Sequence, residues 1–305
     1  MNYFFLGIAC FLFSVQFLFS KRYQLKTGST LTAAVGMTVF DSIWLIALFF
    51  TANRFTLQVT RVSFLYAAFY SGFTIVCAVA SLFAMRYGKV STVCLFLLTG
   101  GLILPVVYGI LLLGEPFGFR KAAGIVFILI SFFVGNLVPK KTTEDEKNRS
   151  HKIRSSLFYI TCFISNGMIS VITKAHSISA NTAPERDFLI LAAILRLLMG
   201  LAILAGLFLQ KKTAARPAEQ KPLAAKQILP LFLIVGGYTL CNGIANDCSL
   251  ITAKTMDSSL QFPMISAAVV LMTAFIGWAV YQEKPSKGEA IGMAFTLCGI
   301  LLMIG

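Results

Sequence analysis

The chain has 305 residues, of which 57% are hydrophobic and only 12% are charged, and its mean hydropathy is +0.82. Because roughly a quarter of the residues in soluble domains are charged, this composition excludes a soluble globular protein and indicates an integral membrane protein. The formal net charge of +14 does not indicate nucleic-acid binding, since most basic residues lie in loops between apolar runs.

Apolar runs of about 18 or more residues can cross the roughly 30 Å of hydrocarbon in a bilayer. The sequence contains ten such runs, at residues 2–20, 31–51, 62–85, 90–113, 119–138, 155–174, 187–209, 228–250, 258–281 and 289–304. We expect the first run to be a retained helix, because positive charges follow it and no A-x-A-like cleavage site closes it. The sequence therefore predicts an all-α integral membrane protein with ten transmembrane helices.

Two stretches at the ends of the fourth and ninth runs are similar: LGEPFGFRKAAG at residues 113–124 and YQEKPSKGEAIG at residues 281–292. The corresponding residues are Glu115 and Glu283, Pro116 and Pro285, and Gly124 and Gly292. Further matches in the same order along the chain indicate an internal duplication.

The duplication divides the chain into a first five-helix repeat at residues 1–138, a charged linker at 139–154 and a second repeat at 155–305. Because five is an odd number, the second repeat enters the membrane from the opposite side. The halves are therefore predicted to be inverted repeats, an arrangement on which many secondary transporters are built.

The repeated motif itself predicts a tight helical hairpin. Its prolines are tolerated at a helix start, and its glutamates favour the positive end of a helix. Its glycines allow a neighbouring helix to approach closely. The sequence leaves open whether Glu115 and Glu283 are purely structural or take part in proton coupling.

Ten spans in two five-span halves, each half with the glutamate turn and the E-x8-G pattern, resemble the drug/metabolite transporter superfamily, in its EamA-type branch. The resemblance covers essentially the whole chain. It implies a secondary transporter that moves small organic solutes or metabolites, such as amino acids or drugs, across the cell membrane by alternating access. Spans two and seven of this family often open with an arginine, which Arg196 matches, whereas the first half has Asp41.

The strongest candidates for a substrate-binding or coupling site are Asp41 and Arg196, which lie near the middle of spans two and seven. A charge at the bilayer centre costs about 2.5–3.5 kcal/mol on insertion scales, so it normally faces a partner or a water-filled cavity. Two interpretations stay open. The residues form a buried ion pair between the spans, or they line a central cavity, where Arg196 binds an anionic group and Asp41 a cationic group or a proton.

Amide side chains form a second group of candidates within the spans. Asn242 and Asn246 are four residues apart in span eight and therefore share one helical face with Tyr238. Asn166 and Gln16 lie in spans six and one. Such amides either line a cavity or make hydrogen bonds between helices.

The remaining candidates are aromatic residues within spans and charges at their ends. Trp44 and Tyr108 either contact substrate or pack between helices. Lys21 and Lys174, matched in the repeats, either act in gating or extend to the headgroups. Asp247 is expected to pair locally or to reach the interface.

No catalytic pattern is evident in the sequence. The two histidines, His151 and His176, lack the spacing of a metal site, and no Walker-type glycine loop is present. The seven cysteines lie within spans and include no C-x-x-C pair. We therefore expect no enzyme activity, no metal and no cofactor.

The sequence thus predicts a carrier in the cell membrane, which in a bacterium is the inner membrane. We expect it to act as a monomer or homodimer, and a proton or another cation is the candidate coupling ion. A flippase of a lipid-linked substrate and a non-transporting scaffold or sensor are the alternatives. The orientation in the membrane stays open. One set of loops contains 18 basic residues and the other seven, so the tendency of basic loops to lie in the cytoplasm places both termini outside. The family resemblance places both termini inside.

Overall fold

The computed structural model describes residues 2–28, 30–87, 90–137, 149–213, 225–281 and 287–304. These residues form ten α-helices and no β-strand. The helices are α1 (Asn2–Thr27), α2 (Leu31–Ala52), α3 (Arg61–Tyr87), α4 (Val90–Leu112), α5 (Phe119–Leu137), α6 (Arg149–Ile178), α7 (Glu185–Thr213), α8 (Ala225–Ala253), α9 (Ser258–Tyr281) and α10 (Lys287–Ile304).

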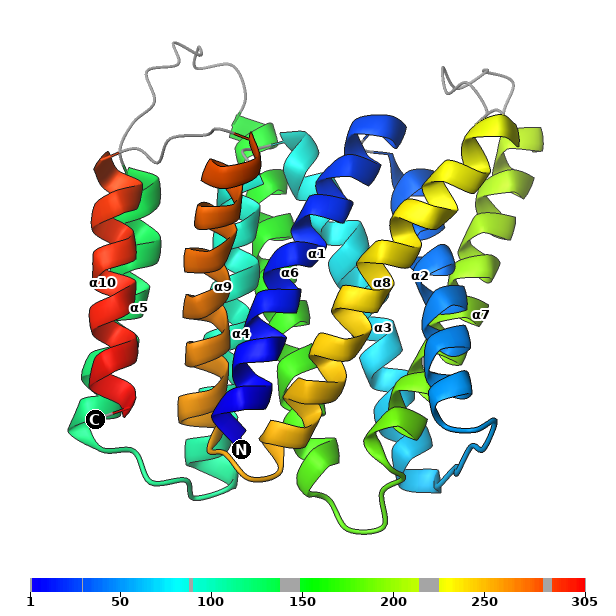
Figure 1. Cartoon of the computed structure of the whole chain (residues 1–305). Helices are drawn as coiled ribbons and strands as arrows, with labels where there is room; N and C mark the ends of the chain where they lie inside the picture. Colours follow the sequence, from blue (N-terminus) through cyan, green and yellow to red (C-terminus); the bar gives the residue numbers. More distant parts are fainter. Residues whose placement is uncertain are drawn as a thin grey trace.

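The helices stand side by side, with α5 and α10 at one edge of the bundle and α2 and α7 at the other (Figure 1). Both ends of the chain lie at the lower end of the bundle in this view, which we call the terminal face. Four connections also lie on the terminal face, at residues 53–60, 113–118, 179–184 and 254–257. The opposite end, where α5 and α7 end and α6 and α8 begin, is called the linker face.

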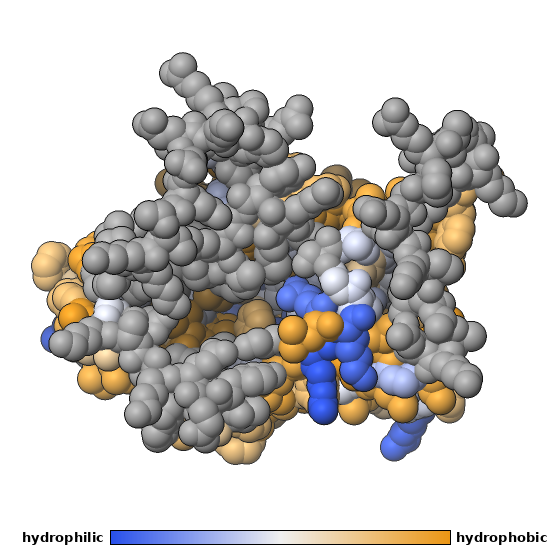
Figure 2. Space-filling view, turned by 90° about the horizontal axis from the view of Figure 1, so that it is seen from above, coloured by the Kyte–Doolittle hydropathy of each residue, from blue (hydrophilic) through white to orange (hydrophobic). Residues whose placement is uncertain are grey.

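Six helices contain, within the described residues, an apolar segment long enough to cross a membrane. These segments are Tyr3–Thr27, Leu31–Ala52, Arg61–Ser81, Ser156–Ile178, Glu185–Leu209 and Ile228–Ala253, and shorter apolar segments lie in α4, α9 and α10. Seen from the linker face, apolar side chains occupy much of the visible outer flank (Figure 2). The chain is therefore an all-helical protein with the composition of a multi-pass membrane protein.

Several helices extend beyond the predicted spans. α1 continues to Thr27 instead of ending at residue 20, and α6 begins at Arg149, inside the predicted linker. Hydropathy marks only the part of a helix that matches hydrocarbon, whereas the backbone of a helix can continue to pair with itself beyond that part. The predicted linker at residues 139–154 therefore overlaps the start of α6, and residues 139–148 lie outside the described residues.

The turn between α1 and α2 has recognisable stop and start signals. Gly28 has a positive φ of 71°, and its N–H donates to the carbonyl oxygen of Gln24 at 2.9 Å. Thr30 then caps α2, because its side-chain oxygen accepts the N–H of Ala33 at 3.1 Å. These residues set where α2, which carries Asp41, begins.

The helices pack in a regular set of pairs. α2 lies against α7 and α5 against α10, while α1 contacts α8 and α9, and α6 contacts α3 and α4. The largest buried apolar cluster joins α2, α3, α6, α7 and α8 and includes the fully buried Phe188 and Ile190. A second cluster around Leu102 and Ile128 joins α4, α5, α9 and α10. Burial of this apolar surface within the bundle supports the packing on which the polar site depends.

Gly124 of the repeated motif lies where α5 and α10 approach closely. A Cβ atom added at Gly124 would lie 2.8 Å from the carbonyl oxygen of Gly299, and one added at Gly299 would lie 2.8 Å from that of Gly124. Its counterpart Gly292 is buried, and its carbonyl oxygen lies 3.0 Å from the hydroxyl of Thr296. That hydroxyl also lies 2.8 Å from Ser131 Oγ on α5, which adds a polar contact between the two helices.

Candidate functional site

Asp41 and Arg196 meet between α2 and α7. Asp41 Oδ2 lies 2.6 Å from Arg196 Nη2, and 5% and 7% of the two side chains are exposed. The ion-pair contact considered from the sequence is therefore present. Because both charges are removed from water near the middle of their helices, each depends on the other for compensation.

Two hydroxyl groups complete the surroundings of the pair. Arg196 Nε donates to Ser42 Oγ at 2.9 Å, and Thr239 of α8 donates to Asp41 Oδ1 at 2.7 Å. Both hydroxyl side chains are fully or almost fully buried. The pair and its hydroxyl partners thus connect α2, α7 and α8. Each charged group has a second polar partner, and a solute that separates the pair would have to replace these hydrogen bonds.

Two tyrosines lie within the electrostatic reach of the pair. Tyr70 of α3 and Tyr238 of α8 both lie within electrostatic reach of Asp41 and Arg196. The structure therefore places the predicted candidate Tyr238 near the central pair and adds Tyr70, which the sequence did not single out. Aromatic rings beside two opposite charges can contact both the apolar part and the cationic group of an organic solute.

The asparagines of α8 bond to each other. Asn246 Nδ2 donates to Asn242 Oδ1 at 2.9 Å and to the carbonyl oxygen of Asn242 at 2.8 Å. Both side chains are half-buried, on the helical face that continues from Tyr238. In α1, the Oε1 atom of Gln16 is buried and has no hydrogen-bond partner among the described residues. Gln16 is thus an amide whose oxygen is available to another group.

Three other predicted candidates have structural contacts. Asn166 Nδ2 donates to the carbonyl oxygen of Leu97 at 2.7 Å and so links α6 to α4. Trp44 Nε1 donates to the carbonyl oxygen of Phe232 at 2.9 Å, and the two rings stack with centroids 4.9 Å apart. Tyr108 is half-buried in α4. The contacts of Asn166 and Trp44 favour a packing role over substrate contact.

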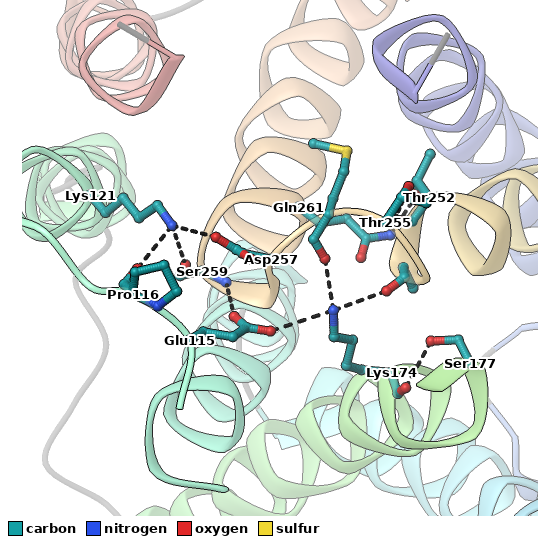
Figure 3. Close-up of polar contacts among 12 residues, drawn as sticks. Glu115, Pro116, Lys121, Lys174, Ser177, Thr252, Thr255, Asp257, Ser259 and Gln261 are labelled. Atoms are coloured by element: carbon teal, nitrogen blue, oxygen red, sulfur yellow. Dashed lines mark hydrogen bonds and ion pairs between the residues drawn. The ribbon is translucent and has the colours of Figure 1, made fainter. Parts of the chain in front are cut away.

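A second buried ion pair lies at the terminal face (Figure 3). Lys174 Nζ lies 3.4 Å from Glu115 Oε1, with 6% and 8% of the two side chains exposed. Lys174 also donates to the carbonyl oxygens of Ala253 at 2.9 Å and Met256 at 2.7 Å, and Glu115 Oε2 accepts the N–H of Ser259 at 3.2 Å. Of the two alternatives for Lys174, extension to the headgroups is therefore wrong, because its ammonium group has three acceptors inside the protein.

The structure also corrects the predicted role of the hairpin residues. α5 begins at Phe119, so Pro116 is not at its first turn, and Glu115 does not cap it. Glu115 instead binds the first turn of α9, where free backbone N–H groups attract a carboxylate. The carbonyl oxygen of Pro116 accepts a hydrogen bond from Lys121 Nζ at 3.0 Å. Glu283 and Pro285 lie outside the described residues.

Partly exposed ion pairs also lie at this face. Lys121 Nζ binds Asp257 Oδ2 at 2.7 Å and Ser259 Oγ at 3.2 Å, with 20% and 41% of the two charged side chains exposed (Figure 3). Asp247 of α8 forms an ion pair with Arg186 of α7, whose Nε lies 3.0 Å from Asp247 Oδ2. The terminal face therefore combines one buried ion pair with pairs that water reaches.

Other features of the described residues do not form a competing site. No group of three or more His, Cys, Asp or Glu side chains among them could hold a metal ion. His176, which is buried, lies 3.1 Å from Ser63 Oγ and stacks on Phe188. A shallow apolar hollow lies along α1, on the outer flank, and is lined by Tyr3, Phe4, Gly7, Ile8, Phe11 and Leu12.

Sequence reasoning missed Ser42, Thr239, Tyr70 and the buried state of Lys174. Hydroxyl groups are too common in membrane helices to stand out, although Ser42 is next to Asp41. A usable signal existed for Lys174. Lys174 lies at the end of span six, and Glu115 directly follows span four. Because even-numbered spans end at the same face of a ten-helix protein, the two opposite charges were to be expected at the same face.

Comparisons with known proteins add information on the fold only. No protein-family model matches the sequence, and no curated protein matches it. A protein of known structure, described only as a crystal structure of a protein, is similar with a TM-score of 0.70 and 17% sequence identity. The similarity covers 99% of this chain and 95% of the other. The ten-helix arrangement is therefore shared with a solved protein along nearly its whole length.

Proposed function

We propose that the chain is a secondary transporter of small organic solutes, built from ten transmembrane helices in two inverted five-helix repeats and working by alternating access. We place it in the EamA-type branch of the drug/metabolite transporter superfamily and in the cell membrane. The observation that carries the proposal is the buried Asp41–Arg196 pair, which joins the second helix of one half to the second helix of the other.

The pattern of helix contacts supports the repeat. Exchanging each helix for its counterpart five positions along the chain converts the contact of α1 with α8 into that of α6 with α3. The same exchange converts the contact of α1 with α9 into that of α6 with α4, and the contact of α3 with α7 into that of α8 with α2. The contacts α2–α7, α4–α9 and α5–α10 join counterparts and are therefore converted into themselves. All of these contacts are present, as a two-fold relation between the halves requires.

The central pair favours transport over a purely structural role because of what surrounds it. A buried ion pair adds little net stability compared with apolar residues of the same volume, so stability alone gives weak reason for a charge at this depth. Here Tyr70 and Tyr238 lie within electrostatic reach of the charges, and hydroxyl groups contact both partners. We infer that a solute separates the pair, placing an anionic group on Arg196 and a cationic or hydroxyl group on Asp41.

Ligand-dependent thermal stability tests this site without knowledge of the substrate. The purified protein is heated with a panel of small zwitterions, organic anions and organic cations. A bound compound at 100 times its dissociation constant stabilises the folded state by about 2.7 kcal/mol. We expect at least one compound to stabilise the native protein but not the Asp41→Asn, Arg196→Gln double variant, and that compound should then enter proteoliposomes.

The matched control removes a different ion pair that is also formed by an aspartate and an arginine. Arg186→Gln with Asp247→Asn neutralises a pair between α7 and α8 at the terminal face and leaves the central pair in place. This control should keep both the stabilisation and the uptake. Equal uptake by the Asp41–Arg196 double variant, or no uptake of any compound by well-folded native protein, would contradict the proposal.

A further inference from the structure

We propose that the Glu115–Lys174 ion pair is a latch that holds the terminal face closed, and that this face opens when the pair separates. This inference rests on the proposed transport function, because it assigns the contact that controls access to the central pair from one side of the membrane. The pair is formed when the face is closed, and water surrounds each charge when the face is open.

The end of α4 fixes the position of Glu115. Gly114 has a positive φ of 64°, which glycine adopts without strain and which turns the chain out of the helix. The N–H of Glu115 then donates to the carbonyl oxygen of Gly109 at 3.0 Å, so the residue is attached to the last turn of α4. Because its backbone is already held in place, Glu115 loses little conformational freedom when the latch forms.

The latch joins the two halves of the chain. Glu115 belongs to the first half, whereas Lys174 lies on α6 and Ser259 on α9, both in the second half. Lys174 also donates to the carbonyl oxygens of Ala253, the last residue of α8, and of Met256 in the following turn (Figure 3). One side chain of the first half is thus connected, at a single point, with α6, α8 and α9 of the second half.

Burial makes separation of the pair and opening of the face one event. A buried charge without a counter-ion is strongly unfavourable, so neither Glu115 nor Lys174 can leave the other until water reaches both. The pair of Lys121 and Asp257 also joins the halves, but both of its side chains are partly exposed. Water therefore weakens this second contact, and the buried pair contributes more to closure.

α8 connects the latch with the central pair. Lys174 holds its last residue, Ala253, and Thr239 in its interior donates to Asp41. A solute that replaces Thr239 at Asp41 displaces this part of the helix, and a continuous helix transmits the displacement to its end. The geometry makes α8 the element through which the central site and the terminal face affect each other.

Two buried oxygen atoms in the first turn of α9 oppose closure. Ser258 Oγ and Gln261 Oε1 belong to fully buried residues and have no hydrogen-bond partner among the described residues. A buried oxygen without a donor is unfavourable, and water that enters an opened face supplies one. The latch therefore holds the face closed against a cost, which keeps the open state within reach.

Hydrogen exchange of the solute-free protein in lipid nanodiscs tests the latch. Segments 113–118 and 253–260 report on the terminal face, one from each half of the chain. Glu115→Gln removes the charge of the latch and keeps the size of the side chain. We expect this variant to open the terminal face about 5 to 150 times more often than the native protein, the usual range for the coupling of linked sites.

Glu185→Gln is the matched control. Glu185 pairs with Lys254 of the same α8–α9 turn, but both residues belong to the second half, so their pair does not hold the halves together. Exchange of the two segments in this variant should stay close to that of the native protein. An equal increase in Glu185→Gln and Glu115→Gln overturns the proposal, because general loosening of the turn would then explain both.

Gly109→Ala opens the latch without changing any charge. A Cβ atom at this position would lie 2.5 Å from Glu115 Oε2 and 3.0 Å from Ser258 Cβ, so the carboxylate has to move. Gly72→Ala is its control, since nothing lies within 4 Å of the added atom. Native-like exchange in Glu115→Gln, or in Gly109→Ala should Glu115→Gln fail to fold, overturns the proposal.

Transport of a compound found with the central site separates the two proposals. Glu115→Gln should still be stabilised by this compound against heat, but its uptake into proteoliposomes should slow by a factor comparable to that seen in exchange, because the terminal face seldom closes. A purely structural pair would instead change binding and uptake in parallel. Uptake at the native rate overturns the latch and leaves transport standing. No uptake by the native protein contradicts transport, and the exchange experiment then still decides whether the pair closes the face.

Discussion

The two buried ion pairs differ in what holds them. Asp41 and Arg196 belong to the interiors of two helices, and their additional partners are side-chain hydroxyl groups on α2 and α8. Glu115 and Lys174 lie at the terminal face, and their additional partners are backbone groups of the turn between α8 and α9. The first pair thus depends on side chains of rigid elements, and the second on the conformation of a connection.

Under the proposed function, this difference would separate the place where a solute binds from a contact that restrains access. Side-chain partners on rigid helices would stay in position if a solute replaced one of the charges, so binding at the central pair would need no rearrangement of the backbone. Backbone carbonyls at a helix end move with the connection, so the terminal pair reports and restrains its position. The comparison predicts different responses when one charge is removed from each pair.

The largest effect is expected at the central pair. Arg196→Gln leaves the Asp41 carboxylate buried with Thr239 as its one hydrogen-bond donor among the described residues, and breaking a buried pair in this way costs about 3–5 kcal/mol. The free energy of unfolding, measured by titration with sodium dodecyl sulfate in mixed micelles, should fall by that amount. The Asp41→Asn, Arg196→Gln double variant should lose less than the single variant. A larger loss in the double variant would contradict the mutual compensation of the two charges.

A smaller loss is expected at the terminal face. Lys174→Met leaves Glu115 with the N–H of Ser259 and the positive end of α9, so the carboxylate keeps part of its stabilisation. We expect the free energy of unfolding to fall by about 1–3 kcal/mol, the cost of a few unmade hydrogen bonds. Lys121→Met, which removes a partly exposed lysine from the same face, is the control and should cost less. A loss at Lys174 equal to that at Arg196 would remove the distinction between the pairs.

The sequence predicted an all-helical fold and marked Asp41 and Arg196 as candidates, but it left open whether they form an ion pair. Long apolar runs mark membrane helices because the bilayer requires them, and a charge in the middle of a run stands out for the same reason. Hydropathy could not show that the helices continue to Thr27 and from Arg149, outside the apolar core. It also could not show that Lys174 turns inward, because that depends on carbonyl oxygens that lie 79 and 82 residues further along the chain.

The smallest effect is expected for an ion pair that water reaches. Lys254 pairs with Glu185 at the terminal face, and 50% and 17% of the two side chains are exposed. Exposed pairs contribute about 0–1 kcal/mol, because water screens the charges and two long side chains lose freedom when they pair. Lys254→Ala should therefore lower the free energy of unfolding by less than Lys174→Met does.

Salt provides a second measurement on the same variant. Ions screen charges in water much more than charges inside the protein, so 1 M sodium chloride, where the Debye length is about 3 Å, should abolish the small effect of Lys254→Ala. The effect of Lys174→Met should persist under these conditions, because only 6% of the Lys174 side chain is exposed. If salt instead removed both effects equally, the ion pair of Lys174 would be accessible to water, and the terminal face would not be closed by a buried contact.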